Sequence, residues 1–235
     1  MRRADPRKPI PSILLWTQGI YHQGALSPDY ACALPETLSR RRPFPDQRSH
    51  RVRDRIVSIS QPHVRPIKRG KAGSDTEFGA KVSVSLVEGY GFVDRTSWDN
   101  FNECQDLQDQ VEAYKRRFGF YPESVHGDRI YRTRDNLRYC REHRIRLSGP
   151  RLGRPPKITP ENADQLRLAA LEARQDELDR IPIEGKFGQG KRRFGLGRLM
   201  TKLASTSETA IALCFLVMNL EKWLAAIFLC LIFKE

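Results

Sequence analysis

The sequence predicts an α/β fold, in which a mixed sheet is flanked by helices. Three observations predict it. Alternating apolar residues between positions 56 and 98 favour strands. Apolar residues recur at helical spacing after Asp99, and short strand and helix patterns then alternate from Ser124 onward. An irregular arm precedes this region, and a long apolar helix follows it.

The sequence predicts an irregular, basic, proline-rich arm over residues 1–50 and a folded domain over residues 51–235. Prolines recur in the arm too often for a helix or strand to persist. The apolar run Ile13–Trp16 is too short for the hydrophobic part of a signal peptide. The arm is either a solvated tail or a basic segment that contacts DNA phosphates.

The first strands predict an antiparallel meander. Ile56–Ser60 alternates like a half-buried strand, and Arg65–Lys71 follows as a basic loop. Phe78–Leu86 is the clearest strand, with apolar side chains on one face and polar ones on the other. Glu88–Gly91 predicts a turn, after which Phe92–Trp98 returns as the next strand.

The middle of the chain alternates between helix and strand. A helix follows Asp99 and ends at Gly119, since four apolar residues share one helical face: Leu107, Val111, Tyr114 and Phe118. Ser124–Asp128 predicts a strand, Thr133–His143 a basic helix, and Arg144–Leu147 a short strand. The predicted order is therefore three strands followed by helix, strand, helix and strand. This order is the one expected of a ribonuclease-H-like core.

The last third predicts two helices. Thr159-Pro160-Glu161 opens a polar helix that runs towards Leu178, and Ile181–Gly188 breaks it. A final helix spans about Ser207 to Phe233. Its segment 210–232 is apolar enough for a transmembrane helix, but three polar residues lie at its centre: Asn219, Glu221 and Lys222. A core helix with a polar stripe is therefore favoured over a membrane span.

The charge favours a polyanionic partner. The chain has 41 Lys and Arg against 28 Asp and Glu, which gives a net charge of +13. Nucleic acid is the first candidate partner and an anionic membrane the second. The five cysteines form no CxxC pair, so a zinc site of that kind and a disulfide framework are not expected, and a reducing cytoplasm fits best.

Two carboxylates are the candidate catalytic and metal-binding residues, Asp128 and Glu184. Asp128 ends a predicted strand, where α/β folds present their chemistry, and Glu184 is expected near a helix start. Their oxygens suit Mg²⁺, which keeps several waters and needs few protein ligands. A surface Asp that caps the next helix is the alternative, and His126 is expected as a strand residue rather than a ligand.

Four cations near Glu184 are the candidate DNA-binding residues: Lys186, Lys191, Arg192 and Arg193. They could hold the phosphates of a DNA strand beside the two carboxylates.

Many short motifs, in order, resemble bacterial insertion-sequence transposases of the acidic-triad (DDE) class. The main ones are Arg55–Pro62, Glu77–Lys81, Tyr121–Arg134, Ile145–Pro155 and Glu184–Gly195. The resemblance implies a ribonuclease-H-like catalytic domain that cuts and joins double-stranded DNA, at transposon ends and target, with Mg²⁺ or Mn²⁺. It also implies that Asp128 is the second acid and Glu184 the third, and that the basic residues after Glu184 contact transposon-end DNA. A homo-oligomer is a candidate assembly.

The first acid of the triad is implied on the first core strand, and the expected family sequence is not recognisable in residues 1–50. Asp54, at the entrance of Ile56–Ser60, is the substitute candidate. The chain thus resembles a truncated or frameshifted copy, impaired in catalysis and an enzyme only if the triad is complete. The alternatives are a non-catalytic basic nucleic-acid-binding protein and a membrane-associated protein anchored by residues 210–232.

Overall fold

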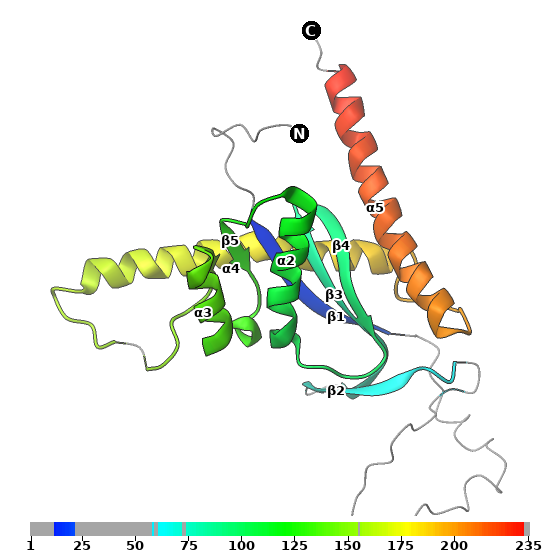
Figure 1. The fold of residues 1–235 in the computed structure, drawn as a ribbon, viewed down its shortest axis with the longest axis horizontal. Helices are drawn as coiled ribbons and strands as arrows, with labels where there is room; N and C mark the ends of the chain where they lie inside the picture. Colours follow the sequence, from blue (N-terminus) through cyan, green and yellow to red (C-terminus); the bar gives the residue numbers. More distant parts are fainter. Residues whose placement is uncertain (1–11, 22–57, 59–60, 72–73, 155, 233–235) are drawn as a thin grey trace, which may run out of the picture.

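The computed structural model describes residues 12–21, 58, 61–71, 74–154 and 156–232. Six strands, two three-residue 3-10 helices and four α-helices follow one another in the described part of the chain. Figure 1 shows their arrangement. In order they are β1 (Ile13–Tyr21), β2 (Arg65–Lys71), β3 (Ser74–Val87), β4 (Tyr90–Ser97), η2 (Glu103–Gln105), α2 (Asp106–Phe118), β5 (Ser124–His126), η3 (Arg129–Tyr131), α3 (Arg134–Glu142), β6 (Arg146–Leu147), α4 (Ala163–Arg193) and α5 (Ala204–Ile232).

The strands form one mixed sheet. The order β4–β3–β1–β5–β6 runs across it, and β2 pairs with the beginning of β3. The pairs among β1, β2, β3 and β4 are antiparallel, whereas β1–β5 and β5–β6 are parallel. A mixed sheet with helices on both faces confirms the predicted ribonuclease-H-like α/β fold.

Each face of the sheet has its own hydrophobic core. Helices α4 and α5 cover one face, where Phe187 and Phe215 pack against alternate residues of β1 and β3. Helices α2 and α3 cover the other face, where Tyr114 and Cys140 pack against Ile13 and its neighbours. Successive side chains of a strand point to opposite faces, so the central strand β1 contributes to both cores.

β1 corrects the prediction that residues 1–50 are irregular throughout. Ile13–Tyr21 forms the central strand of the sheet, paired with β3 along one edge and with β5 along the other. These partners are more than fifty residues away, so a local reading of a proline-rich region does not reveal them. The remainder of the predicted arm lies outside the described residues.

Of two further segments predicted before β3, one lies mostly outside the described residues and the other forms a strand. Within the predicted strand Ile56–Ser60 the structure describes only Ser58, which is not in a strand, and Asp54 also lies outside the described residues. Arg65–Lys71 forms β2, not the predicted basic loop, because its backbone pairs with β3. The strands predicted at Phe78–Leu86 and Phe92–Trp98 are confirmed as β3 and β4, as is the helix that ends at Gly119.

α4 corrects the predicted break at Ile181–Gly188. The helix continues through Pro182 and three glycines as far as Arg193. Ile183 and Phe187 from this segment are fully buried in the core, and this burial offsets the cost of proline and glycine in a helix. Glu184 therefore lies inside a long helix and not near a helix start.

α5 is a core helix only in its first half, which corrects the other helix prediction. Its buried residues are Ser207, Ile211, Phe215 and Met218, and Asn219 holds the backbone of Gly91 through hydrogen bonds of 2.9 and 2.7 Å. Beyond Lys222 the helix extends away from the sheet (Figure 1) with its large apolar side chains exposed. By length and composition alone, α5 could cross a membrane.

Candidate active site

Asp128 lies two residues beyond β5, at the end of a parallel strand next to the centre of the sheet. Its Oδ1 accepts a hydrogen bond of 2.8 Å from the backbone amide of Arg129 and so caps η3. Asp128 therefore has the capping role that the sequence offered as an alternative. The carboxylate can still bind a ligand, because the Asp128 side chain is 52% exposed.

Arg180 joins the two predicted acids. It lies one turn before Glu184 on α4, and its Nη1 is 3.2 Å from Oδ1 of Asp128. Its Nε is 3.6 Å from Oε1 of Glu184 without forming a hydrogen bond, so that contact is a purely electrostatic one. The structure thus brings Asp128 and Glu184 together around one guanidinium group.

Sequence reasoning did not single out Arg180. The signal that could have found it is its spacing of four residues from Glu184, which places both on one helix face. The predicted helix break between the two residues concealed that spacing.

Trp16 is the residue of β1 that lies beside Arg180. In the parallel register Leu14 lies opposite His126, so Trp16 and Asp128 stand two residues further along their respective chains. The Arg180 guanidinium carbon is 5.3 Å from the centre of the Trp16 ring, a cation–π contact. β1 contains neither Asp nor Glu, so the central strand adds no carboxylate to the pair.

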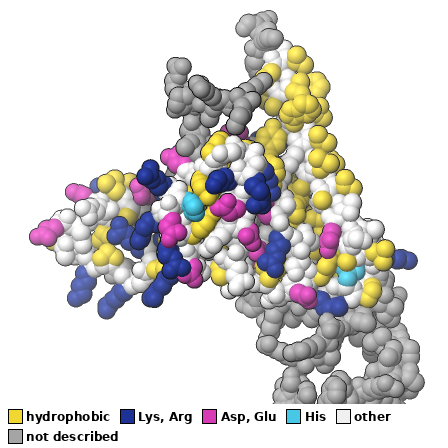
Figure 2. Space-filling model, in the orientation of Figure 1, with side chains coloured by type: hydrophobic (Ala, Val, Ile, Leu, Met, Phe, Trp, Pro, Cys, Tyr) yellow, Lys and Arg dark blue, Asp and Glu magenta, His cyan; other side chains and the backbone are white. Residues whose placement is uncertain are grey.

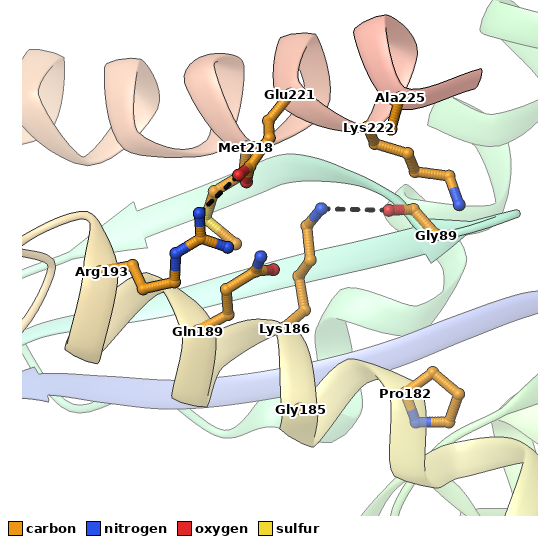
Figure 3. A pocket seen from close by; sticks show the side chains of 10 residues that line it. All are labelled: Gly89, Pro182, Gly185, Lys186, Gln189, Arg193, Met218, Glu221, Lys222 and Ala225. Atoms are coloured by element: carbon orange, nitrogen blue, oxygen red, sulfur yellow. Dashed lines mark hydrogen bonds and ion pairs between the residues drawn. The ribbon is translucent and has the colours of Figure 1, made fainter. Parts of the chain in front are cut away.

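The structure separates the four predicted DNA-binding cations. Lys186 is buried and donates a 3.2 Å hydrogen bond to the carbonyl of Gly89, and burial together with the charge of Lys222 lowers its pKa. It lines an open cavity of about 450 Å³ between α4 and α5 (Figure 3). This position does not suit direct contact with a DNA backbone.

The remaining three cations lie at the end of α4. Arg192 and Arg193 are exposed, and Lys191 is half-buried. Arg193 pairs with Glu221 of α5 at 2.6 Å (Figure 3). Other Lys and Arg side chains gather with acidic ones over α3 and the first half of α4, on the face shown in Figure 2.

A second group of polar side chains connects β5, β6 and α4. His126 is buried in β5, and its Nδ1 lies 3.4 Å from Oδ1 of Asp176. Burial lowers the pKa of His126, against the opposing effect of Asp176, so the contact is not an ion pair at neutral pH. Arg146 of β6 donates two hydrogen bonds to Asp176, of 2.7 and 3.1 Å.

Asp128 and Glu184, called the acid pair below, suit a hard divalent cation. Two exposed carboxylates converge on one positively charged group, and carboxylate oxygens are the protein ligands that Mg²⁺ and Mn²⁺ prefer. Asp128 and Glu184 would hold such an ion.

The comparison with protein families agrees with this geometry. Residues 125–221 match the family model described as transposase DDE domain, a segment that contains Asp128, Arg180 and Glu184. No curated protein matched the chain. A domain of this family implies DNA binding and the use of a divalent metal. Over residues 125–221 the chain is therefore similar to the DDE domain of transposases.

Proposed function

We propose that this protein binds transposon-end and target DNA in a sequence-specific manner, and that Asp128 and Glu184 hold Mg²⁺ or Mn²⁺ for strand cleavage and transfer. We further propose that the missing carboxylate on β1 impairs catalysis. The observation that carries both proposals is the meeting of Asp128 and Glu184 around Arg180, beside Trp16.

The acid pair determines how strongly a metal can bind. Asp128 and Glu184 supply two negative charges, and Arg180 offsets one of them. A third carboxylate would raise the net negative charge of the site and so favour binding of a divalent cation. Asp128 and Glu184 would hold the metal, which would supply activation of the attacking water or 3′-hydroxyl and stabilisation of the leaving oxygen.

The chain's own residues position the DNA. Arg192 and its neighbours at the end of α4 lie three turns or less from Glu184 on the same helix, so they can hold phosphates near the acid pair. Contacts of this type release counterions, so we expect DNA affinity to fall steeply as the salt concentration rises.

The test is metal-dependent nicking of plasmid and transposon-end DNA by the purified full chain. Wild type should nick slowly with Mn²⁺, and Asp128→Ala should remove that activity. Trp16→Asp, which adds a carboxylate beside Asp128, should raise the rate at least about tenfold, which corresponds to about 1.4 kcal/mol. Trp16→Asn is the matched control without charge, and rapid cleavage by Asp128→Ala would refute the proposal.

The second candidate function is a non-catalytic DNA-binding protein, which the absence of an acid from β1 favours. Such a protein should bind DNA without Mg²⁺ and should bind equally well after Glu184→Gln. A metal requirement for binding would exclude this alternative.

Two further expectations stay proposals. We propose a cytoplasmic protein and a homo-oligomer on paired DNA ends. Size-exclusion chromatography with and without DNA tests the assembly.

A further inference from the structure

Three side chains outside the acid pair converge between β5 and α4: His126, Asp176 and Asp179. We propose that they form a second metal site, which takes a divalent transition metal such as Zn²⁺. This proposal is independent of the proposed DNA cleavage, since none of the three residues belongs to the acid pair.

The geometry suits a small cation. The possible ligand atoms of the three residues all lie within 4.8 Å of one another. His126 Nδ1 and Asp176 Oδ1 are 3.4 Å apart, which is about the separation of two ligands at roughly 2.1 Å from a tetrahedral zinc ion. Asp179 is half-buried at the edge of the group, so its carboxylate can approach by rotation of the side chain.

His126 provides the second, independent observation. Its side chain is 3% exposed, and Nδ1 has no hydrogen-bond partner. A buried polar atom without a partner is unfavourable, and native proteins seldom contain one. The other ring nitrogen, Nε2, lies 3.0 Å from the Ser124 hydroxyl. This contact fixes the ring with Nδ1 towards the aspartates, as outer partners of metal-ligating histidines do.

The two aspartates differ in how the protein holds them. They lie three residues apart on α4, on one helix face, where like charges repel. Arg146 and the Gly149 amide donate hydrogen bonds to Asp176, and the charge of Arg132 also acts on this carboxylate. Asp179 accepts a hydrogen bond from neutral Gln175, so a cation beside Nδ1 of His126 would add a positive partner for Asp179.

The ligand types select the metal. Imidazole favours Zn²⁺ and similar transition metals over Mg²⁺, which prefers sites made of oxygen alone. The site connects β5 to α4, the two elements that position Asp128 and Glu184. A bound ion would therefore fix the distance between the elements that carry the acid pair.

The experiment measures Zn²⁺ binding by calorimetry and Co²⁺ binding by visible absorption, with untagged full chain freed of metal by a chelator. Wild type should bind one Zn²⁺ with micromolar or better affinity and gain thermal stability. His126→Asn and Asp179→Asn should each weaken Zn²⁺ binding more than tenfold. Glu177→Gln, an exposed carboxylate on the same helix, is the charge-matched control and should bind as wild type does.

Asp128→Asn separates this site from the acid pair, because it should leave Zn²⁺ binding unchanged. Wild-type protein that binds no Zn²⁺, or binding that survives Asp179→Asn, would overturn the proposal. Loss of binding in Asp128→Asn alone would also overturn it, by placing the ion at the acid pair. Asp179 is half-buried and outside both cores, so its variant should fold, and circular dichroism checks that it does.

Discussion

At the residue scale, Arg180 lies between two carboxylates that would otherwise repel each other. Its guanidinium contacts Asp128 and Glu184 and also lies over the Trp16 ring. A divalent cation at the acid pair must compete with this internal cation. Partly exposed ion pairs of this kind each contribute about 0–1 kcal/mol.

Replacement of Arg180 should therefore strengthen metal binding. We expect Arg180→Ala to raise Mn²⁺ affinity about threefold to tenfold, as the loss of one or two such ion pairs implies. Titration followed by electron paramagnetic resonance measures the change. Arg174→Ala, an exposed arginine on the same helix, is the control. Unchanged Mn²⁺ affinity in Arg180→Ala would mean that Arg180 does not compete with the ion.

His126 predicts how stability depends on pH in metal-free buffer. Burial lowers its pKa below the ordinary 6.5, so in mildly acidic solution the unfolded chain binds a proton that the folded chain does not. The free energy of unfolding should therefore fall as the pH drops from about 7 through 6.5 towards the lower folded-state pKa.

His126→Asn removes this contribution. Its melting temperature should fall less between about pH 7.5 and 5.5 than that of wild type, as differential scanning fluorimetry would show. Equal slopes for wild type and His126→Asn would contradict the lowered pKa.

At the element scale, helix α4 carries Arg180 and Glu184 and also packs on the hydrophobic core. Pro182 lies between Arg180 and Glu184, and its missing amide leaves one carbonyl of the helix without its usual partner. The helix continues because Ile183 and Phe187 are buried against the sheet. Packing, rather than local helix propensity, therefore sets the positions of Arg180 and Glu184.

Pro182→Ala should stabilise the protein. Proline costs about 3 kcal/mol relative to alanine in a helix interior, so we expect a gain of about 1–3 kcal/mol in the free energy of unfolding by urea. Pro160→Ala, before the helix, should change stability much less. A loss of stability in Pro182→Ala would show that the helix needs the proline at this bend.

At the scale of the whole molecule, α5 has two parts with different roles. Residues up to Met218 pack on the sheet, and Asn219 holds Gly91. The end of the helix exposes a group of large apolar side chains: Trp223, Leu224, Ile227, Phe228, Leu229, Leu231 and Ile232. An exposed apolar surface of this kind favours association.

Truncation after Lys222 tests this division. The truncated protein should keep its melting temperature within about 3 °C, because the removed residues bury little surface. It should also aggregate less than the full chain, as light scattering would show. A large fall in melting temperature would mean that the end of α5 is part of the fold. Recovery of the full chain without detergent would exclude an obligatory membrane anchor.

Much of the fold could be predicted because its signals are local. The alternation in β3, the turn at Gly89 and the apolar face of α2 each lie within one element. β1 and β2 were missed because their stability comes from pairing with β3, far away in sequence. The continuity of α4 was missed because burial on the sheet outweighs Pro182.

The sequence by itself carries the resemblance to the transposase family, the prediction of the two acids and the excess of basic residues, since residue type, spacing and order carry those signals. Only the tertiary structure decided what surrounds the acids. Parallel pairing of β1 with β5 brings Trp16 alongside Asp128, and packing of α4 on the sheet brings Arg180 between Asp128 and Glu184. Arg180 and Asp128 are 52 positions apart in the sequence, and burial of β1, β5 and α4 in the common cores brings them together.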